Sequence, residues 1–140
     1  MKHPDAARSR LMARVKRKDT APELALRKAL WAMGLRYRLH PKLPGTPDLS
    51  FPTAKVAIFV DGCFWHGCPL HGSRPKTNAD FWLQKLARNR ARDTAADVAL
   101  ARLSWKSVRL WEHQLRRHEV NKTANGVARI IERRLKRLRR

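Results

Sequence analysis

The stretch that decides the fold is DLSFPTAKVAIFVDGCFWHGCPLH, residues 48–71. Residues 48–51 and 55–60 have the composition of strands, and Pro52-Thr53-Ala54 between them has the composition of a turn. We therefore predict two antiparallel neighbours in a sheet, the second more deeply buried than the first. A loop dense in cysteine, histidine and aromatic residues follows directly.

A helix is predicted upstream of this stretch. Thr20-Ala21-Pro22-Glu23 has the pattern of a capping box, and Gly34 suits the left-handed residue that ends a helix. Residues 36–40 alternate weakly and indicate a further strand. The apolar residues of the predicted helix are Leu24, Leu26, Leu30 and Trp31.

Three more elements are predicted downstream. Thr77-Asn78-Ala79-Asp80 opens the longest helix, which runs to about Leu103, and residues 105–111 form a strand that ends in Glu112-His113. Residues 121–140 form a basic amphipathic helix. The apolar positions are Phe81, Leu86, Val98 and Leu103 in the long helix, and Val127, Ile130, Ile131, Leu135 and Leu138 in the last one.

This order of elements favours a mixed central sheet flanked by helices, of the α/β (α+β) type, in a single domain over residues 1–140. Residues 1–18 form a basic arm that includes Arg14. The arm is either a solvated segment or a phosphate clamp that orders on DNA, and its composition leaves both open.

The charge of the chain points to a polyanionic partner. Its 32 Lys and Arg residues against 11 Asp and Glu leave a net charge of +21. Nucleic acid is the expected partner, because neutralising phosphates releases counterions, and an anionic membrane surface is the alternative. With no apolar run of roughly 20 residues and no signal-peptide core, we expect an intracellular protein whose Cys63 and Cys68 stay reduced.

Asp48 is the first candidate for chemistry. After Thr46-Pro47, an aspartate is most simply a turn residue. The next strand, however, would run back beside it and bring Asp48 close to Val60 and Asp61. A carboxylate with a main-chain carbonyl or a second carboxylate makes a hard-oxygen site suited to Mg²⁺.

The Cys/His loop has the chemistry of a zinc site. Cys63, Cys68 and His71 follow a C-x4-C-x2-H spacing, and His113 could supply a fourth ligand. That set leaves His66 free to act on water, whereas His66 as the fourth ligand would remove the base. Two buried thiols without a metal are the remaining alternative.

Aromatic residues and Glu23 each allow two interpretations. Phe64, Trp65 and Trp82 are either core packing or a wedge that inserts between base pairs, which a mismatch makes easier. Glu23 either completes its capping box or points into the metal site, and the sequence pattern favours the cap.

Together these residues resemble the very short patch repair endonucleases of bacteria. The resemblance runs from about Arg8 to Leu115. The segments that carry it are Arg8-Ser9-Arg10-Leu11-Met12, Asp19-Thr20-Ala21-Pro22-Glu23, Pro44-Gly45-Thr46-Pro47-Asp48, residues 60–68, Phe81-Trp82, Arg88-Asn89, Arg92-Asp93 and Trp111-Glu112.

The resemblance implies a restriction-endonuclease-like fold with a zinc-braced loop, and a Mg²⁺-dependent nick 5′ to the thymine of a T·G mismatch in duplex DNA. It implies that Asp48 and the Val60 carbonyl hold Mg²⁺, that His66 is the general base and that Glu23 belongs to the active site. It also implies structural zinc on Cys63, Cys68, His71 and His113, an aromatic wedge of Phe64, Trp65 and Trp82, and DNA contacts from Arg14, Lys85, Arg88 and Asn89.

The chain departs from one familiar member of that family at two positions. Asp61 stands where that member has histidine, and could add a metal ligand or a hydrogen bond. His113 stands where it has cysteine, which preserves zinc-ligand chemistry. Cys63 occupies the usual lysine offset of restriction enzymes, which agrees with His66 as the proton acceptor.

We therefore expect a monomeric, mismatch-directed DNA nicking enzyme of the bacterial cytoplasm, associated with the nucleoid. Two rivals remain. A restriction-type nuclease of the same fold would lack mismatch preference, and a non-enzymatic, zinc-braced DNA-binding protein would bind without Mg²⁺-dependent cleavage.

Overall fold

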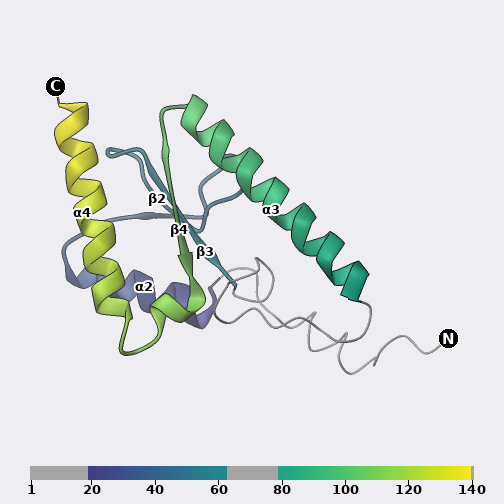
Figure 1. Cartoon of the computed structure of the whole chain (residues 1–140). Coiled ribbons are helices and arrows are strands. Elements are labelled where there is room, and N and C mark those ends of the chain that lie inside the picture. The colour runs from purple at the N-terminus through teal and green to yellow at the C-terminus, as the bar shows by residue number, and fades with distance from the viewer. Residues whose placement is uncertain (1–18, 63–78, 140) are drawn as a thin grey trace.

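The computed structural model describes residues 19–62 and 79–139 of the chain (Figure 1). These residues form a four-stranded sheet, three α-helices and one short 3₁₀ helix. The elements in chain order are α2 (Ala21–Ala32), β1 (Arg38–Leu39), β2 (Leu49–Phe51), β3 (Val56–Asp61), α3 (Ala79–Arg102), β4 (Lys106–Trp111), η1 (Glu112–Leu115) and α4 (Val120–Leu138).

The sheet is mixed, as predicted. Its strand order is β1-β2-β3-β4, with antiparallel pairing from β1 to β3 and parallel pairing of β3 with β4. Leu49 lies opposite Ile58 in the antiparallel part, and Ile58 lies opposite Val108 in the parallel part. Parallel strands need a long crossover, and α3 lies in the connection between β3 and β4.

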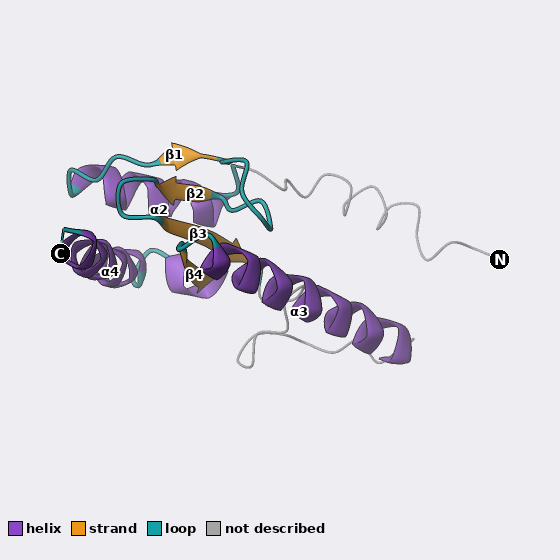
Figure 2. Cartoon of the chain, turned by 90° about the horizontal axis from the view of Figure 1, so that it is seen from above, coloured by secondary structure: helices purple, strands orange, loops and turns teal. Residues whose placement is uncertain are grey.

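The helices lie in two layers, with α2 and α4 on one face of the sheet and α3 on the other (Figure 2). Val56 and Ile58 of β3 belong to the cluster that contains α2 and α4 residues, whereas Ala57 and Phe59 pack with Leu100 of α3. A strand that is covered on both faces has apolar residues at almost every position, which explains the composition of residues 55–60.

The ends of α2 lie where the sequence predicts them. Thr20 is the N-cap, and its Oγ1 accepts a hydrogen bond from the Glu23 N–H at 3.4 Å. Gly34 follows the helix with a φ of +85°, which a side chain rarely adopts. No helix within residues 19–62 and 79–139 combines the length with the apolar character needed to cross a membrane.

The predicted apolar faces of two helices are partly wrong. In α2, Leu26 and Leu30 are buried, but Leu24 and Trp31 are about half exposed. In α3, Phe81 and Val98 are exposed, as is Leu103 just after the helix, and the buried positions are Ala96 and Leu100. The amino-terminal half of α3 extends past the described strands in both views, so only its second half packs on the sheet (Figures 1 and 2).

The helix α4 and the end of β4 agree more closely with prediction. Val127 and Ile131 are buried and Ile130 and Leu135 pack against them, while Leu138 is exposed. The strand β4 ends at Trp111, and Glu112 and His113 open η1 instead of closing the strand. This 3₁₀ turn leads the chain from the sheet into α4.

Candidate active site

Asp48 lies directly before β2 and is fixed to β3 by two hydrogen bonds. Its N–H donates to the Ile58 carbonyl at 2.9 Å, and its Oδ2 accepts from the Val60 N–H at 2.7 Å. The second bond is charge-assisted when the carboxylate is ionised. The strand pairing therefore brings Asp48 beside Val60, as the sequence predicts.

Glu23 lies in the first turn of α2, and only 1% of it is exposed. Its Oε2 accepts hydrogen bonds from the Asp19 N–H and, at 2.9 Å, from Arg27 Nη2. Its Oε1 is buried and has no hydrogen-bond partner among the described residues. The side chain therefore does not complete the reciprocal capping box with Thr20, which corrects the interpretation favoured by the sequence pattern.

The carboxyl groups of Asp48 and Glu23 are neighbours. The pKa of Asp48 is raised to about 6, mainly by burial and also by the neighbouring Glu23 carboxylate, while the Val60 N–H and His40 oppose the shift. Two acidic groups in one buried place favour a shared proton or a cation between them. The orphaned Glu23 Oε1 and the Asp48 carboxylate thus offer hard oxygen donors of the kind Mg²⁺ prefers.

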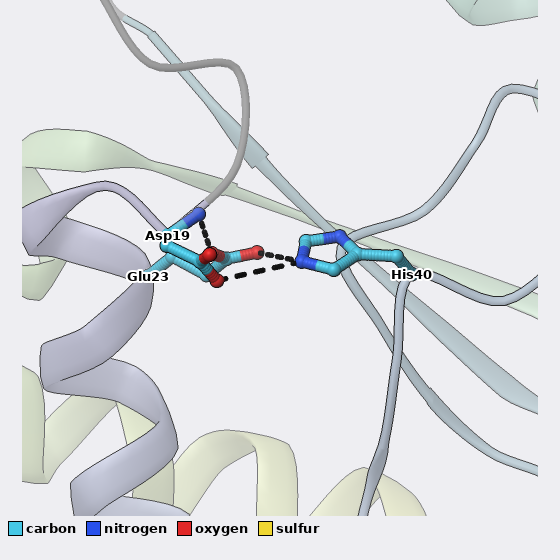
Figure 3. Close-up of side chains that lie close together, drawn as sticks. All are labelled: Asp19, Glu23 and His40. Atoms are coloured by element: carbon cyan, nitrogen blue, oxygen red, sulfur yellow. Dashed lines mark hydrogen bonds and ion pairs between the residues drawn. The ribbon is translucent and has the colours of Figure 1, made fainter.

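A second group of ligand-type side chains lies beside this pair. Asp19, Glu23 and His40 converge so that one atom of each lies within 4.8 Å of the others (Figure 3). Arg27 lies among them, with Nη2 at 2.6 Å from Asp19 Oδ1 and 3.2 Å from His40 Nε2. This group could hold a metal ion, but a guanidinium already supplies a positive charge.

Asp61 lies at the end of β3 and faces α3 through Arg109 of β4. Arg109 Nη1 is 3.3 Å from each Asp61 oxygen, and Nε is 3.1 Å from Asp97 Oδ1. The guanidinium also lies 4.0 Å from the centre of the Phe59 ring. Asp61 is buried, so Arg109 compensates a charge that a metal ion would otherwise have to balance.

A cavity of about 490 Å³ opens between the strand ends and α3. Asp48, Val60 and Asp61 line it from the sheet, and Asn89 and Arg92 line it from α3. An acidic floor with an amide and a guanidinium on the wall suits a phosphate group that is held next to a cation.

Some of the other predicted site residues lie within the described part of the chain, and the rest lie outside it. Trp82, Lys85, Arg88 and Asn89 lie on α3; the Trp82 ring is 5.5 Å from that of Phe81, and Lys85 Nζ is 5.6 Å from the Trp82 centroid. His113 lies in η1. Arg14, Cys63, Phe64, Trp65, His66, Cys68 and His71 lie outside the described residues.

Asp19, Arg27, His40 and Arg109 belong to the site but were not predicted as site residues from the sequence. Arg109 had a signal, because it is a charged residue between the apolar Val108 and Leu110 of a predicted strand. Arg27 follows Glu23 by four residues, a spacing that favours an ion pair on a helix. Nothing in the sequence marks His40, which reaches the cluster from the end of β1.

A pair of neighbouring carboxyl groups, one buried and one partly buried, lies at one end of a mixed sheet beside a cavity of about 490 Å³. On a chain of charge +21 this arrangement has the chemistry of a nuclease. The sequence model of the DNA mismatch endonuclease Vsr family matches residues 2–71. The chain belongs to this family, and it is a DNA nicking endonuclease of the Vsr type. Nucleases of this family depend on metal ions.

Similar proteins carry related descriptions. The type II nicking enzyme V.NaeI of Lentzea aerocolonigenes is 45% identical over 116 residues, which cover 79% of this chain and 70% of that enzyme. The type II nicking enzyme V.XorIIP of Xanthomonas oryzae pv. oryzae is 46% identical over 110 residues, 75% of this chain and 79% of that enzyme. The DNA mismatch endonuclease Vsr of Escherichia coli is 38% identical over 120 residues, 84% of this chain and 76% of that enzyme.

Proposed function

We propose that this protein nicks duplex DNA 5′ to the thymine of a T·G mismatch and so starts very short patch mismatch repair in the bacterial cytoplasm. The observation that carries the proposal is the pairing of the buried Glu23 with the partly buried Asp48, beside the start of β2 and the end of β3. The similarity to an enzyme described as a DNA mismatch endonuclease supports the choice of substrate. The mixed sheet fits a restriction-endonuclease-like architecture. The enzyme would act as a monomer.

The acidic residues would bind the metal ion in this reaction. Asp48, Glu23 and the Val60 carbonyl would hold Mg²⁺, and Asp61 lies in the same cavity as an additional acidic group. The fit rests on the buried Glu23 Oε1, which accepts no hydrogen bond from the described residues. When bound, Mg²⁺ would neutralise charge that develops on the phosphate.

The remaining roles belong to side chains that move a proton or hold DNA. His66 would accept the proton of the attacking water. Phe64, Trp65 and Trp82 would form the wedge at the mismatch, and a structural zinc on Cys63, Cys68, His71 and His113 would brace the loop that carries two of them. Arg14, Lys85, Arg88 and Asn89 would contact DNA, of which Asn89 lines the cavity.

A nick without mismatch preference is the second candidate. It is favoured by the similarity to two enzymes that are described simply as type II nicking enzymes. Cutting a T·G duplex and the matched T·A duplex at the same rate would establish it.

The decisive test is a nicking assay on a T·G duplex and its T·A counterpart, with and without Mg²⁺. We expect nicking of the T·G duplex only with Mg²⁺, and at least about a hundredfold loss of kcat in Asp48→Ala with DNA binding retained. Glu132→Ala removes an exposed acid from α4 and should nick like the wild type. Normal nicking by Asp48→Ala would refute the metal assignment, and binding without any nicking would favour a non-enzymatic protein.

A further inference from the structure

The two oxygens of Glu23 have different surroundings, and Arg27 creates the difference. Oε2 accepts hydrogen bonds from the Arg27 guanidinium at 2.9 Å and from the Asp19 N–H, whereas Oε1 is buried, accepts no hydrogen bond from the described residues and lies 3.9 Å from His40 Nε2. The Arg27 side chain is only 12% exposed, so its charge is poorly screened by water. The hydrogen-bonding capacity of one oxygen is therefore used, and that of the other is not.

Arg27 also holds the cluster on its other side. Its Nη2 lies 2.6 Å from Asp19 Oδ1 and 3.2 Å from His40 Nε2. A planar guanidinium with several donors suits this bridging, which a single ammonium group would reproduce poorly. Arg27 is thus the cation that the ligand atoms of Asp19, Glu23 and His40 surround.

The backbone supports the same arrangement. Asp19 and His40 both adopt left-handed conformations, with φ values of 55° and 44°. This region is uncommon for residues other than glycine, and such residues persist where the surrounding contacts hold them. The left-handed Asp19 directs both its N–H to Glu23 and its carboxylate to Arg27.

We propose that Arg27 is a positioning residue that decides where the catalytic cation binds. It holds Glu23 Oε2 and keeps a divalent ion away from the Asp19–His40 side, because an ion there would lie within a few ångströms of a guanidinium. It thereby leaves Oε1, the Glu23 oxygen without a hydrogen bond among the described residues, free to bind the metal that Glu23 and Asp48 would share in the proposed nicking reaction. The predicted effect of Arg27 on nicking rests on the proposed function. Its predicted effect on where a divalent ion binds rests on electrostatics alone.

Removing the guanidinium should open a new ion site. Without Arg27, the imidazole of His40 and the carboxylates of Asp19 and Glu23 have the donor types that suit Mn²⁺ and similar ions. An ion bound there would draw Glu23 away from Asp48. In a variant without Arg27, part of the ion binding would therefore depend on His40, and the nicking rate would fall.

The experiment measures Mn²⁺ binding by electron paramagnetic resonance and calorimetry, together with Mg²⁺-dependent nicking, in zinc-loaded full-length protein. In Arg27→Gln we expect additional Mn²⁺ binding that the double variant Arg27→Gln/His40→Gln loses, and at least about a tenfold lower kcat. In the wild type, His40→Gln should leave Mn²⁺ binding unchanged. Lys28→Gln removes a neighbouring exposed charge from α2 and should match the wild type in both measurements.

Two outcomes would overturn the inference: Mn²⁺ binding by Arg27→Gln that equals the wild type and is independent of His40, or nicking by Arg27→Gln at the wild-type rate. If Arg27→Gln does not fold, Arg27→Lys keeps the charge but not the bridge. For Arg27→Lys we then expect Mn²⁺ binding equal to that of the wild type together with slower nicking. Nicking at the wild-type rate would contradict the positioning role of Arg27. A wild-type protein that nicks no duplex would refute the proposed function, while the Mn²⁺ arms would still decide the ion-binding claim.

Discussion

Burial of the Asp48 carboxyl group makes its protonation a matter of stability as well as of catalysis. Its pKa in the folded protein is about 6, whereas that of an unperturbed aspartate is 3.8. The folded state therefore binds the proton more tightly than the unfolded chain does. This group destabilises the fold increasingly as pH rises from about 4 to about 6, and the full penalty is present above that range.

Asp48→Asn should remove this penalty while keeping an oxygen for the Val60 N–H. In Mg²⁺-free buffer at pH 7.5, we expect the variant to be more stable than the wild type by about 1–2 kcal/mol. The difference should shrink at pH 4.5, where Asp48 of the folded wild type is mostly protonated. Urea denaturation at the two pH values measures this, and a difference that stays constant would contradict the assignment.

At this same scale, the sequence predicted some site residues and missed others for a physical reason. Asp48 was predictable because its position is set by a local turn and a strand that runs directly back. The burial of Glu23 was not, because it depends on how α2 packs against the sheet. His40 reaches Glu23 only through the pairing of β1 with β2, a contact without a local pattern.

Among the elements, the close approach of α3 to the sheet depends on one glycine. Gly45 has a φ of +78°, and a Cβ placed there would lie 2.5 Å from Ala96 Cβ and 3.2 Å from the Phe59 ring. Small residues therefore set the distance between α3 and the sheet, where they bound the cavity beside Asp48. A side chain at residue 45 would have to displace the helix or distort the loop.

Three glycines separate the effects of strain and crowding. Gly45→Ala should destabilise the protein by about 2–4 kcal/mol, because it adds a clash to an unfavourable φ. Gly34 has the same type of φ but open space around it, so Gly34→Ala should lower the stability by only about 1 kcal/mol. Gly126→Ala, in α4 with nothing nearby, should stabilise by about 0.5–1 kcal/mol. Urea denaturation gives all three, and equal effects of Gly45→Ala and Gly34→Ala would rule out the clash.

The elements themselves were largely predictable, and their contact faces were less so. Turn residues, the Thr20 cap and the apolar run of β3 are local signals, and all of them lie where predicted. The face of α3 is not a local property. It packs through Ala96 and Leu100 while other apolar residues of the helix stay exposed, and the close approach of Gly45 at Ala96 comes from a loop distant in sequence.

Over the whole molecule, the positive charge exceeds what the site requires. The outward face of α4 carries five exposed basic residues and one acid, Glu132, which lies 3.5 Å from Lys136. The basic residues are Lys122, Arg129, Arg133, Lys136 and Arg137. They recur along one side of the helix, opposite the side that packs on α2 and the sheet. Such a face suits phosphates, whose contacts position a protein on DNA without reading its sequence.

Replacing Arg129, Arg133 and Arg137 together by glutamine tests whether this face contacts DNA. Each lost phosphate contact should flatten the dependence of log K on log salt by about 0.9 units. T·G and T·A duplexes should lose affinity equally, because phosphate contacts do not distinguish the bases. Titrations of both duplexes over a range of salt concentrations measure the slope and the affinity ratio, with Glu132→Gln as a control that removes no basic group. An unchanged slope would mean that the α4 face lies away from DNA, and a changed ratio would mean that it takes part in mismatch recognition.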